Sequence, residues 1–138
     1  MDQERILSKF DKIETYLEEL EKIKVVDLEE YKRSIKDKRA SERLLQISVE
    51  NVLDICNILV SELRLGLPSD EGDIFQKLYK KKIISRDMKN ILINMKGLRN
   101  ILVHRYGEID DEKVHEVLTD NLEDFDKFKE EIISFLEK

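Results

Sequence analysis

Apolar residues recur every three or four positions along almost the whole chain, and this helical spacing constrains the fold more than any other feature. The clearest break is Gly66-Leu67-Pro68-Ser69-Asp70, where glycine and proline end one helix and a serine or aspartate can begin the next. Hydrophobic and charged residues each make up 41% of the chain, which is typical of helices with charged outer faces. No strand-like alternation and no internal repeat accompany the pattern, so we expect an all-α protein.

The apolar pattern predicts five helices in one domain, residues 1–138. We expect them over 3–24, 28–64, 71–81 and 86–105, with a last helix that begins at Asp110 or Asp111 and Gly107 as the stop of the fourth. Short links between them predict an antiparallel bundle of four or five helices. Candidate capping residues at the other starts are Asp27 with Glu30, Ser69 or Asp70, and Ser85.

The second predicted helix carries the most apolar segment of the chain. Between Leu44 and Val60 it is apolar on more than one face, so we expect it to be buried on several sides or to carry a partner's surface. Ile35 near its start and Val103 in the fourth helix are among the residues expected to face inward. No apolar run approaches the ~20 residues of a membrane span. With a charged N-terminus and a single cysteine, Cys56, we expect a cytoplasmic protein without membrane association.

The residues best suited to chemistry are concentrated in one short segment, Arg99-Asn100-Ile101-Leu102-Val103-His104-Arg105-Tyr106. Histidine moves protons near neutral pH, and arginine is the best holder of a phosphate. Together they are the minimum equipment for cutting RNA without a metal. Taken singly, each has an ordinary explanation: His104 as a residue near a helix C-terminus, Arg99 as an ion-pair partner and Tyr106 at the edge of the core.

On a regular helix Arg99 and His104 do not share a face. Their spacing separates the two side chains by about 140° around the axis. Asn100 and His104 do share a face, as do Arg99 and Tyr106. Three arrangements would still bring arginine and histidine together. The long arginine reaches around, the helix frays near His104, or two copies of the motif meet across a dimer, which suits a bundle with a spare apolar face.

The charge distribution is strongly uneven along the chain. Residues 77–105 contain nine basic residues against one acid, a net charge of +8, whereas the remainder holds 16 basic and 30 acidic residues. This block contains the Arg–His motif, and a basic surface is what a phosphate backbone requires. Lys96 and Arg105 are the candidates for RNA contact. The alternative for the block is an ordinary solvated helix face.

For the other candidate residues the sequence gives a weaker indication of function. Glu50 and Asp54 lie one turn apart on the long helix. They could form ion pairs with basic residues such as Arg43 or Lys96, face solvent, or hold a metal ion. The interpretation we prefer is that one of them is the acid that fixes Arg99. His115 is expected at the surface, and Cys56 is expected to be a small buried hydrophobe.

The chain resembles the HepT-like toxins of the HEPN ribonuclease superfamily. The Arg-x4-His-x-Tyr motif from Arg99 to Tyr106 carries the resemblance, and further matches follow in order from about Tyr31 to Phe135. They are the segment 38–47 with Glu50, Leu53 and Asp54, then Pro68, Phe75, Leu78, Ile83, Ile84 and the segment 95–100.

The resemblance implies a metal-independent endoribonuclease that acts as a homodimer and needs no cofactor. Arg99 would hold the scissile phosphate, His104 would move the proton, and Asn100 would orient the imidazole or the phosphate. The resemblance also implies an MntA-like nucleotidyltransferase antitoxin, which would attach AMP to Tyr106. The alternative is a non-catalytic helical module that binds a nucleotide or a protein partner.

Overall fold

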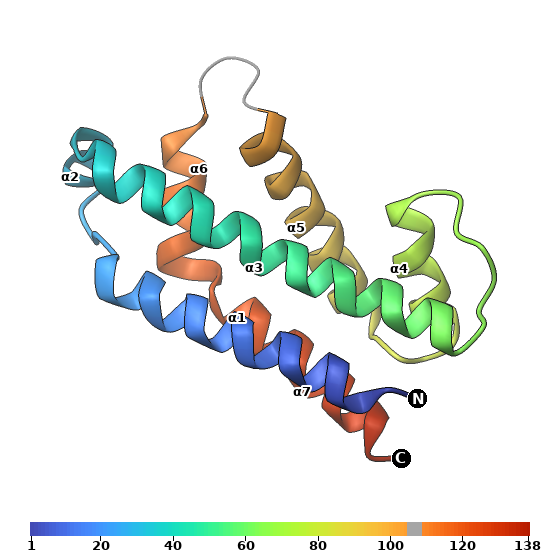
Figure 1. Ribbon diagram of the computed structural model, residues 1–138. Coiled ribbons are helices and arrows are strands. Elements are labelled where there is room, and N and C mark those ends of the chain that lie inside the picture. The colour runs from blue at the N-terminus through green and yellow to red at the C-terminus, as the bar shows by residue number, and fades with distance from the viewer. Residues whose placement is uncertain (105–108) are drawn as a thin grey trace.

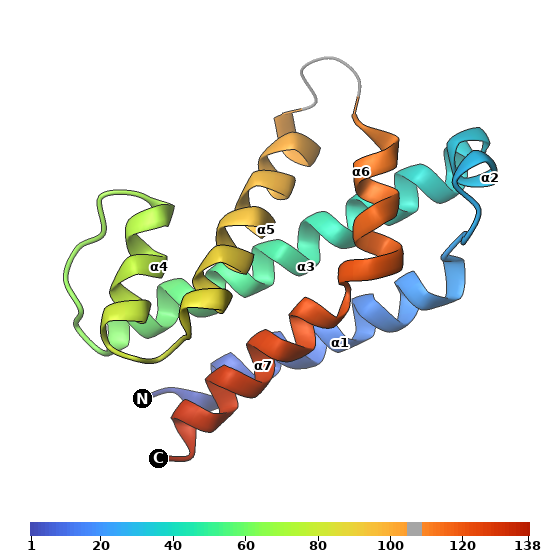
Figure 2. The same cartoon turned by 180° about the vertical axis from the view of Figure 1, so that it is seen from behind.

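The computed structural model describes residues 1–104 and 109–138 as a helical bundle (Figures 1 and 2). Within these ranges there is no strand, which confirms the all-α prediction. The α-helices are α1 (Gln3–Ile23), α2 (Leu28–Arg33), α3 (Ile35–Glu62), α4 (Glu71–Lys80), α5 (Arg86–His104), α6 (Asp111–Glu116) and α7 (Glu123–Leu136), with a π-helical turn, η1 (Val117–Asn121), between the last two.

The helix α3 is the centre of the bundle, and it packs against α1, α4 and α5. The helices α4 and α6 lie on opposite flanks of α5, and the two chain termini lie at the same end of the molecule (Figures 1 and 2). Helices α1 and α7 pack against each other through Phe10 and Phe128, whose ring centroids are 5.7 Å apart. Both aromatic side chains are buried, and burial of such apolar surface is the main source of stability in a bundle of this kind.

Two of the predicted helices are interrupted. The predicted 28–64 helix divides at Ser34, whose extended backbone ends α2 and whose Oγ accepts a hydrogen bond from the amide of Asp37 in α3. Serine offers the backbone this alternative partner, and periodicity alone does not reveal it. Ile35, predicted to face inward, directly follows this break and is 69% exposed. The predicted last helix is likewise divided, by the π-helical turn η1.

The predicted helix starts are correct, because each capping side chain accepts a backbone hydrogen bond there. Asp27 accepts from the amide of Glu30 at 3.0 Å and Asp70 from that of Asp73 at 2.7 Å. Ser85 accepts from Met88 at 3.0 Å, and Asp110 accepts from the first turn of α6. Of the two candidates before α4, Asp70 is therefore the cap. Each such bond satisfies an amide that the helix itself leaves without a partner.

The apolar character of α3 reflects its central position. Its segment from Leu45 to Val60 is buried on several sides, as predicted. By length and composition alone α3 is apolar enough to cross a membrane, which corrects the expectation that no segment approaches a span. More than half of its apolar window is buried among the other helices, as in the core helix of a bundle.

Candidate active site

The helix α5 has one face in the core and an opposite face that carries the motif histidine. Its buried face contains Met88, Leu92, Met95, Leu98 and Leu102. At about 100° per residue, Ile93, Gly97, Asn100, Ile101 and His104 gather within about 100° of one another on the opposite side. Ile93 and Ile101 are 45% and 39% exposed, so this face is apolar as well as polar. Val103, predicted to face inward, is 43% exposed, because it lies in the last turn of α5 at the edge of the buried face.

The side chain of Arg99 is directed toward α4. Its Nη2 lies 2.5 Å from Oε1 of Glu71, and the side chains of the two residues are 19% and 31% exposed. Glu71 is the first residue of α4, 28 positions earlier in the chain. The acid beside Arg99 is therefore Glu71, and the preferred interpretation of Glu50 and Asp54 was wrong. Asp54 instead pairs with Lys9, at 3.2 Å.

Asn100 contacts the arginine. Its Oδ1 accepts a hydrogen bond from Nε of Arg99 at 3.0 Å. The sequence led us to expect that Asn100 orients the imidazole or the phosphate, whereas the bond in the structure orients the guanidinium. Arg99 is thus held through Nε by its neighbour and through Nη2 by a residue from another helix.

His104 is the last residue of α5 and is exposed. The α-helix is regular up to this point, so it does not fray before His104; fraying after His104 would fall outside the described residues. On this regular helix the side chains of Arg99 and His104 are therefore about 140° apart around the helix axis, as the sequence predicted. Arg105 and Tyr106 lie outside the described residues.

The basic block does not form one surface around the motif. Lys80, Lys81, Lys82 and Arg86 are exposed at the turn between α4 and α5, and Arg86 is roughly 20 Å along the helix from Arg99. Lys96 lies one turn before Arg99 and is half-buried. Of the described basic residues in this block, Lys96 and Arg99 are therefore those placed at the motif end of α5.

The remaining candidates have structural roles. His115 is half-buried rather than a surface residue: its Nε2 lies 2.9 Å from the carbonyl oxygen of Val25, and its ring packs on Tyr31. Cys56 is buried as predicted, and burial raises the pKa of its thiol. In residues 1–104 and 109–138 no three acidic, histidine or cysteine side chains gather as a metal site would require.

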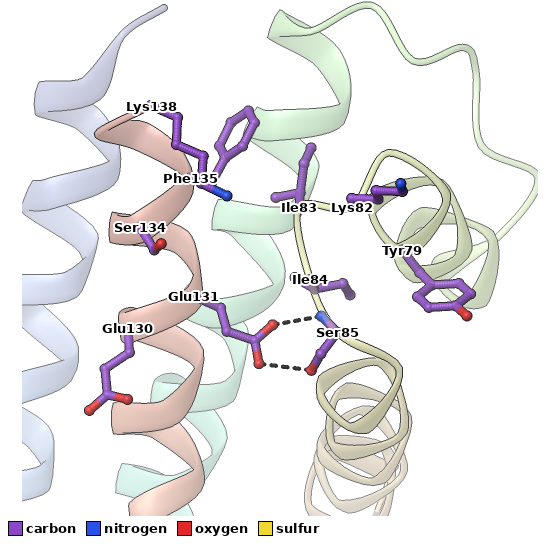
Figure 3. A pocket seen from close by; sticks show the side chains of 10 residues that line it. All are labelled: Tyr79, Lys82, Ile83, Ile84, Ser85, Glu130, Glu131, Ser134, Phe135 and Lys138. Carbon is purple, nitrogen blue, oxygen red and sulfur yellow. Dashed lines mark hydrogen bonds between the residues drawn. The ribbon is translucent and has the colours of Figure 1, made fainter.

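A hollow of about 510 Å³ lies at the other end of α5, between the α4–α5 turn and α7 (Figure 3). One of its polar lining residues is Glu131, whose carboxylate accepts hydrogen bonds from the backbone amide and the hydroxyl of Ser85, at 2.6 and 2.8 Å. Because Ser85 caps α5, this contact fixes the start of that helix against α7. The hollow lies far from Arg99 and His104, and we assign it a structural role.

An all-α bundle with an arginine and a histidine near the end of one helix is the arrangement that the resemblance to helical ribonucleases implies, and comparisons with known proteins show this class. The family model described as ribonuclease HepT-like matches residues 13–132, so the chain belongs to the HepT-like ribonuclease family. It is an endoribonuclease of the toxin class.

Two similar proteins bear the same family name. The chain is 29% identical to the tRNA nuclease HepT of Aphanizomenon flos-aquae over 95% of this chain and 89% of that protein. It is 37% identical to the mRNA nuclease HepT of Shewanella oneidensis over 61% of this chain and 63% of that protein.

Solved structures agree over nearly the full length. A toxin–antitoxin structure with AMP-PNP has a TM-score of 0.87 at 27% identity, covering 95% of this chain and 98% of that one. A tri-AMPylated Shewanella oneidensis HEPN toxin in complex with MNT antitoxin has a TM-score of 0.86 at 28% identity, covering 94% of this chain and 97% of that one.

Proposed function

We propose that this chain cleaves RNA through Arg99 and His104 without a metal ion. The observation that carries the proposal is the presence of both residues near the end of α5 in a chain of the HepT-like ribonuclease family. Arg99 is held in place by two acceptors, and His104 is exposed where a substrate can reach it. Lys96, and Arg105 outside the described residues, supply further positive charge for the RNA backbone.

The chemistry follows from the properties of these two side chains. A ribose 2′-oxygen attacks the adjacent phosphorus, its proton passes to a base, and the bond from phosphorus to the 5′-oxygen breaks as that oxygen takes up a proton. The imidazole of His104 suits either transfer near neutral pH. The guanidinium of Arg99 neutralises the charge that develops on the phosphate oxygens. Use of the 2′-hydroxyl explains a preference for RNA over DNA.

The site is completed by a second copy of the chain. His104 lies on the face of α5 opposite the core, together with Ile93, Gly97 and Ile101. A Cβ atom added at Gly97 would meet nothing within 4 Å, so the fold of one chain does not require glycine there. Glycine inside a helix costs about 1 kcal/mol relative to alanine, and close approach of another backbone is a reason to keep it. Pairing through this face would bring two His104 side chains into one cleft.

An MntA-like nucleotidyltransferase is the partner that we propose for regulation. The tyrosine oxygen of Tyr106 would attack the α-phosphorus of ATP, forming the AMP ester and releasing pyrophosphate. Tyr106 follows His104 by two positions, so the added negative charge would arise beside the catalytic residues and repel RNA. The tri-AMPylated neighbour in complex with an antitoxin supports this proposal. The intact mass after incubation with such an enzyme and ATP, for parent and Tyr106→Phe, tests it.

The decisive experiment compares cleavage of a defined RNA by the parent, Arg99→Ala and His104→Ala, all in EDTA. Intact mass is measured first, so that protein carrying AMP is not mistaken for inactive enzyme. We expect the parent alone to cut, with melting temperature and dimer formation nearly unchanged in His104→Ala. A folded, unmodified parent that cuts none of several RNAs would contradict the proposal.

The alternative, a non-catalytic binding module, is disfavoured because the named relatives are nucleases. We also propose that residues 1–138 act as a single domain and that the protein works in the cytoplasm. Fractionation of cells that express a tagged chain would test the location.

A further inference from the structure

We infer that Glu71 is a positioning residue of the ribonuclease site, and that it fixes the guanidinium of Arg99 so that one end of it faces the scissile phosphate. The inference rests on the proposed function. The observation is the ion pair between Glu71 Oε1 and Arg99 Nη2, which links the start of α4 to the motif helix α5.

The donors of Arg99 divide into an occupied and an available set. A guanidinium has five N–H donors, one on Nε and two on each Nη. Asn100 takes the donor on Nε and Glu71 takes one on Nη2. In the part of the chain that the structure describes, no hydrogen bond is made by Nη1. Two donors on Nη1 and one on Nη2 are therefore available, and together they match the two-oxygen binding that arginine offers a phosphate.

The pair restricts the motion of a long side chain. A free arginine has about 2 kcal/mol of rotamer entropy, and an acceptor at each of two guanidinium nitrogens reduces the number of rotamers before RNA arrives. The Arg99 and Glu71 side chains are only 19% and 31% exposed, so solvent screens their attraction less than on an open surface. A preorganised donor stabilises developing charge without reorganisation during the reaction.

The rest of α4 holds Glu71 in place. Ile74, Phe75 and Leu78 are buried, and Asp70 caps the helix. On the adjoining surface Lys89 of α5 donates to Oε1 of Gln76 at 2.8 Å and lies over the ring of Tyr79. Glu71 therefore projects from a helix anchored along its length, which is the rigid support that a site requires.

A different role is also physically possible for a carboxylate at this place. Glu71 could compete with RNA for Arg99, in which case the pair would be a latch that reduces activity. The two roles predict opposite results. Removing a positioning residue lowers the turnover number, whereas removing a competitor raises the efficiency of cleavage.

The test measures kcat and KM for RNA cleavage by the parent, Glu71→Ala and Glu71→Gln, with Arg99→Ala as the inactive reference. We expect Glu71→Ala to lower kcat by roughly 10- to 100-fold. Glutamine keeps an acceptor oxygen and removes a charge that repels phosphate, so Glu71→Gln should recover most of kcat and lower KM. Asp73→Asn is the matched control, because Asp73 lies in the same first turn but pairs with Lys77.

The outcomes separate this inference from the proposed function. A parent that cuts RNA while Arg99→Ala does not, combined with unchanged or increased kcat in a folded Glu71→Ala, overturns the positioning role. A parent that does not cut RNA overturns the proposed function itself. A loss of activity in Glu71→Gln as large as in Glu71→Ala also contradicts the inference, since the acceptor geometry is retained there.

Discussion

The exposed glycine of α5 allows the proposed dimer to be tested with a single methyl group. In an isolated chain, Gly97→Ala adds a Cβ into open space and removes the conformational freedom of glycine in the middle of a helix. The free energy of unfolding should therefore rise by about 1 kcal/mol wherever the protein is monomeric. Urea denaturation at low protein concentration measures this directly.

The same methyl group should weaken the dimer if two α5 helices meet at Gly97. Overpacking a closely packed contact costs about 1–3 kcal/mol, and a symmetric pair contains the change twice. Taking about 2 kcal/mol in total, the dissociation constant rises roughly 30-fold. Sedimentation equilibrium over a range of concentrations gives this constant. Thr15→Ala on α1 is the control, since it also improves helix propensity at an exposed position but lies on another helix.

A stabilised monomer with an unchanged dissociation constant would show that this face of α5 does not form the interface. A parent that is monomeric at every concentration tested would refute the dimer itself. A less stable Gly97→Ala monomer would instead contradict the interpretation of Gly97 as open to solvent in the single chain.

Three further predictions concern stability. Tyr31→Phe should raise the free energy of unfolding by about 1 kcal/mol, because within the described residues the buried hydroxyl of Tyr31 has no hydrogen-bond partner; a lower melting temperature would contradict this. Glu131→Ala should lower the free energy of unfolding, measured by urea denaturation, by about 1 kcal/mol, because the two hydrogen bonds to Ser85 are lost. No change would show that this contact does not stabilise the start of α5. Burial raises the pKa of Asp124, so its ionisation opposes folding as the pH rises above the unfolded value, and Asp124→Asn should stabilise the protein at pH 7 but not below about pH 4. Melting temperatures of parent and variant across this pH range test the last prediction, and an equal difference at both ends of the range would contradict it.

The sequence alone was enough to predict that the chain is helical and where most helices begin. Spacing of apolar residues reports on one helix at a time, and capping by Asp27, Ser85 and Asp110 depends on residues within a few positions of one another. The break at Ser34 was missed because it replaces one local hydrogen bond by another without disturbing the apolar pattern. The π-helical turn before α7 gave no signal of its own in the spacing.

The candidate site likewise contains residues that the sequence could predict and one that it could not. Arg99 and His104 could be proposed from the sequence because their chemistry and spacing are local properties of one segment. Glu71 could not, since an acid in the first turn of a helix is explained by the helix dipole alone. Only the packing of α4 against α5 brings its carboxylate to Arg99 across 28 positions of chain. The partner of a charged side chain depends on distance in space, and that is decided by tertiary structure.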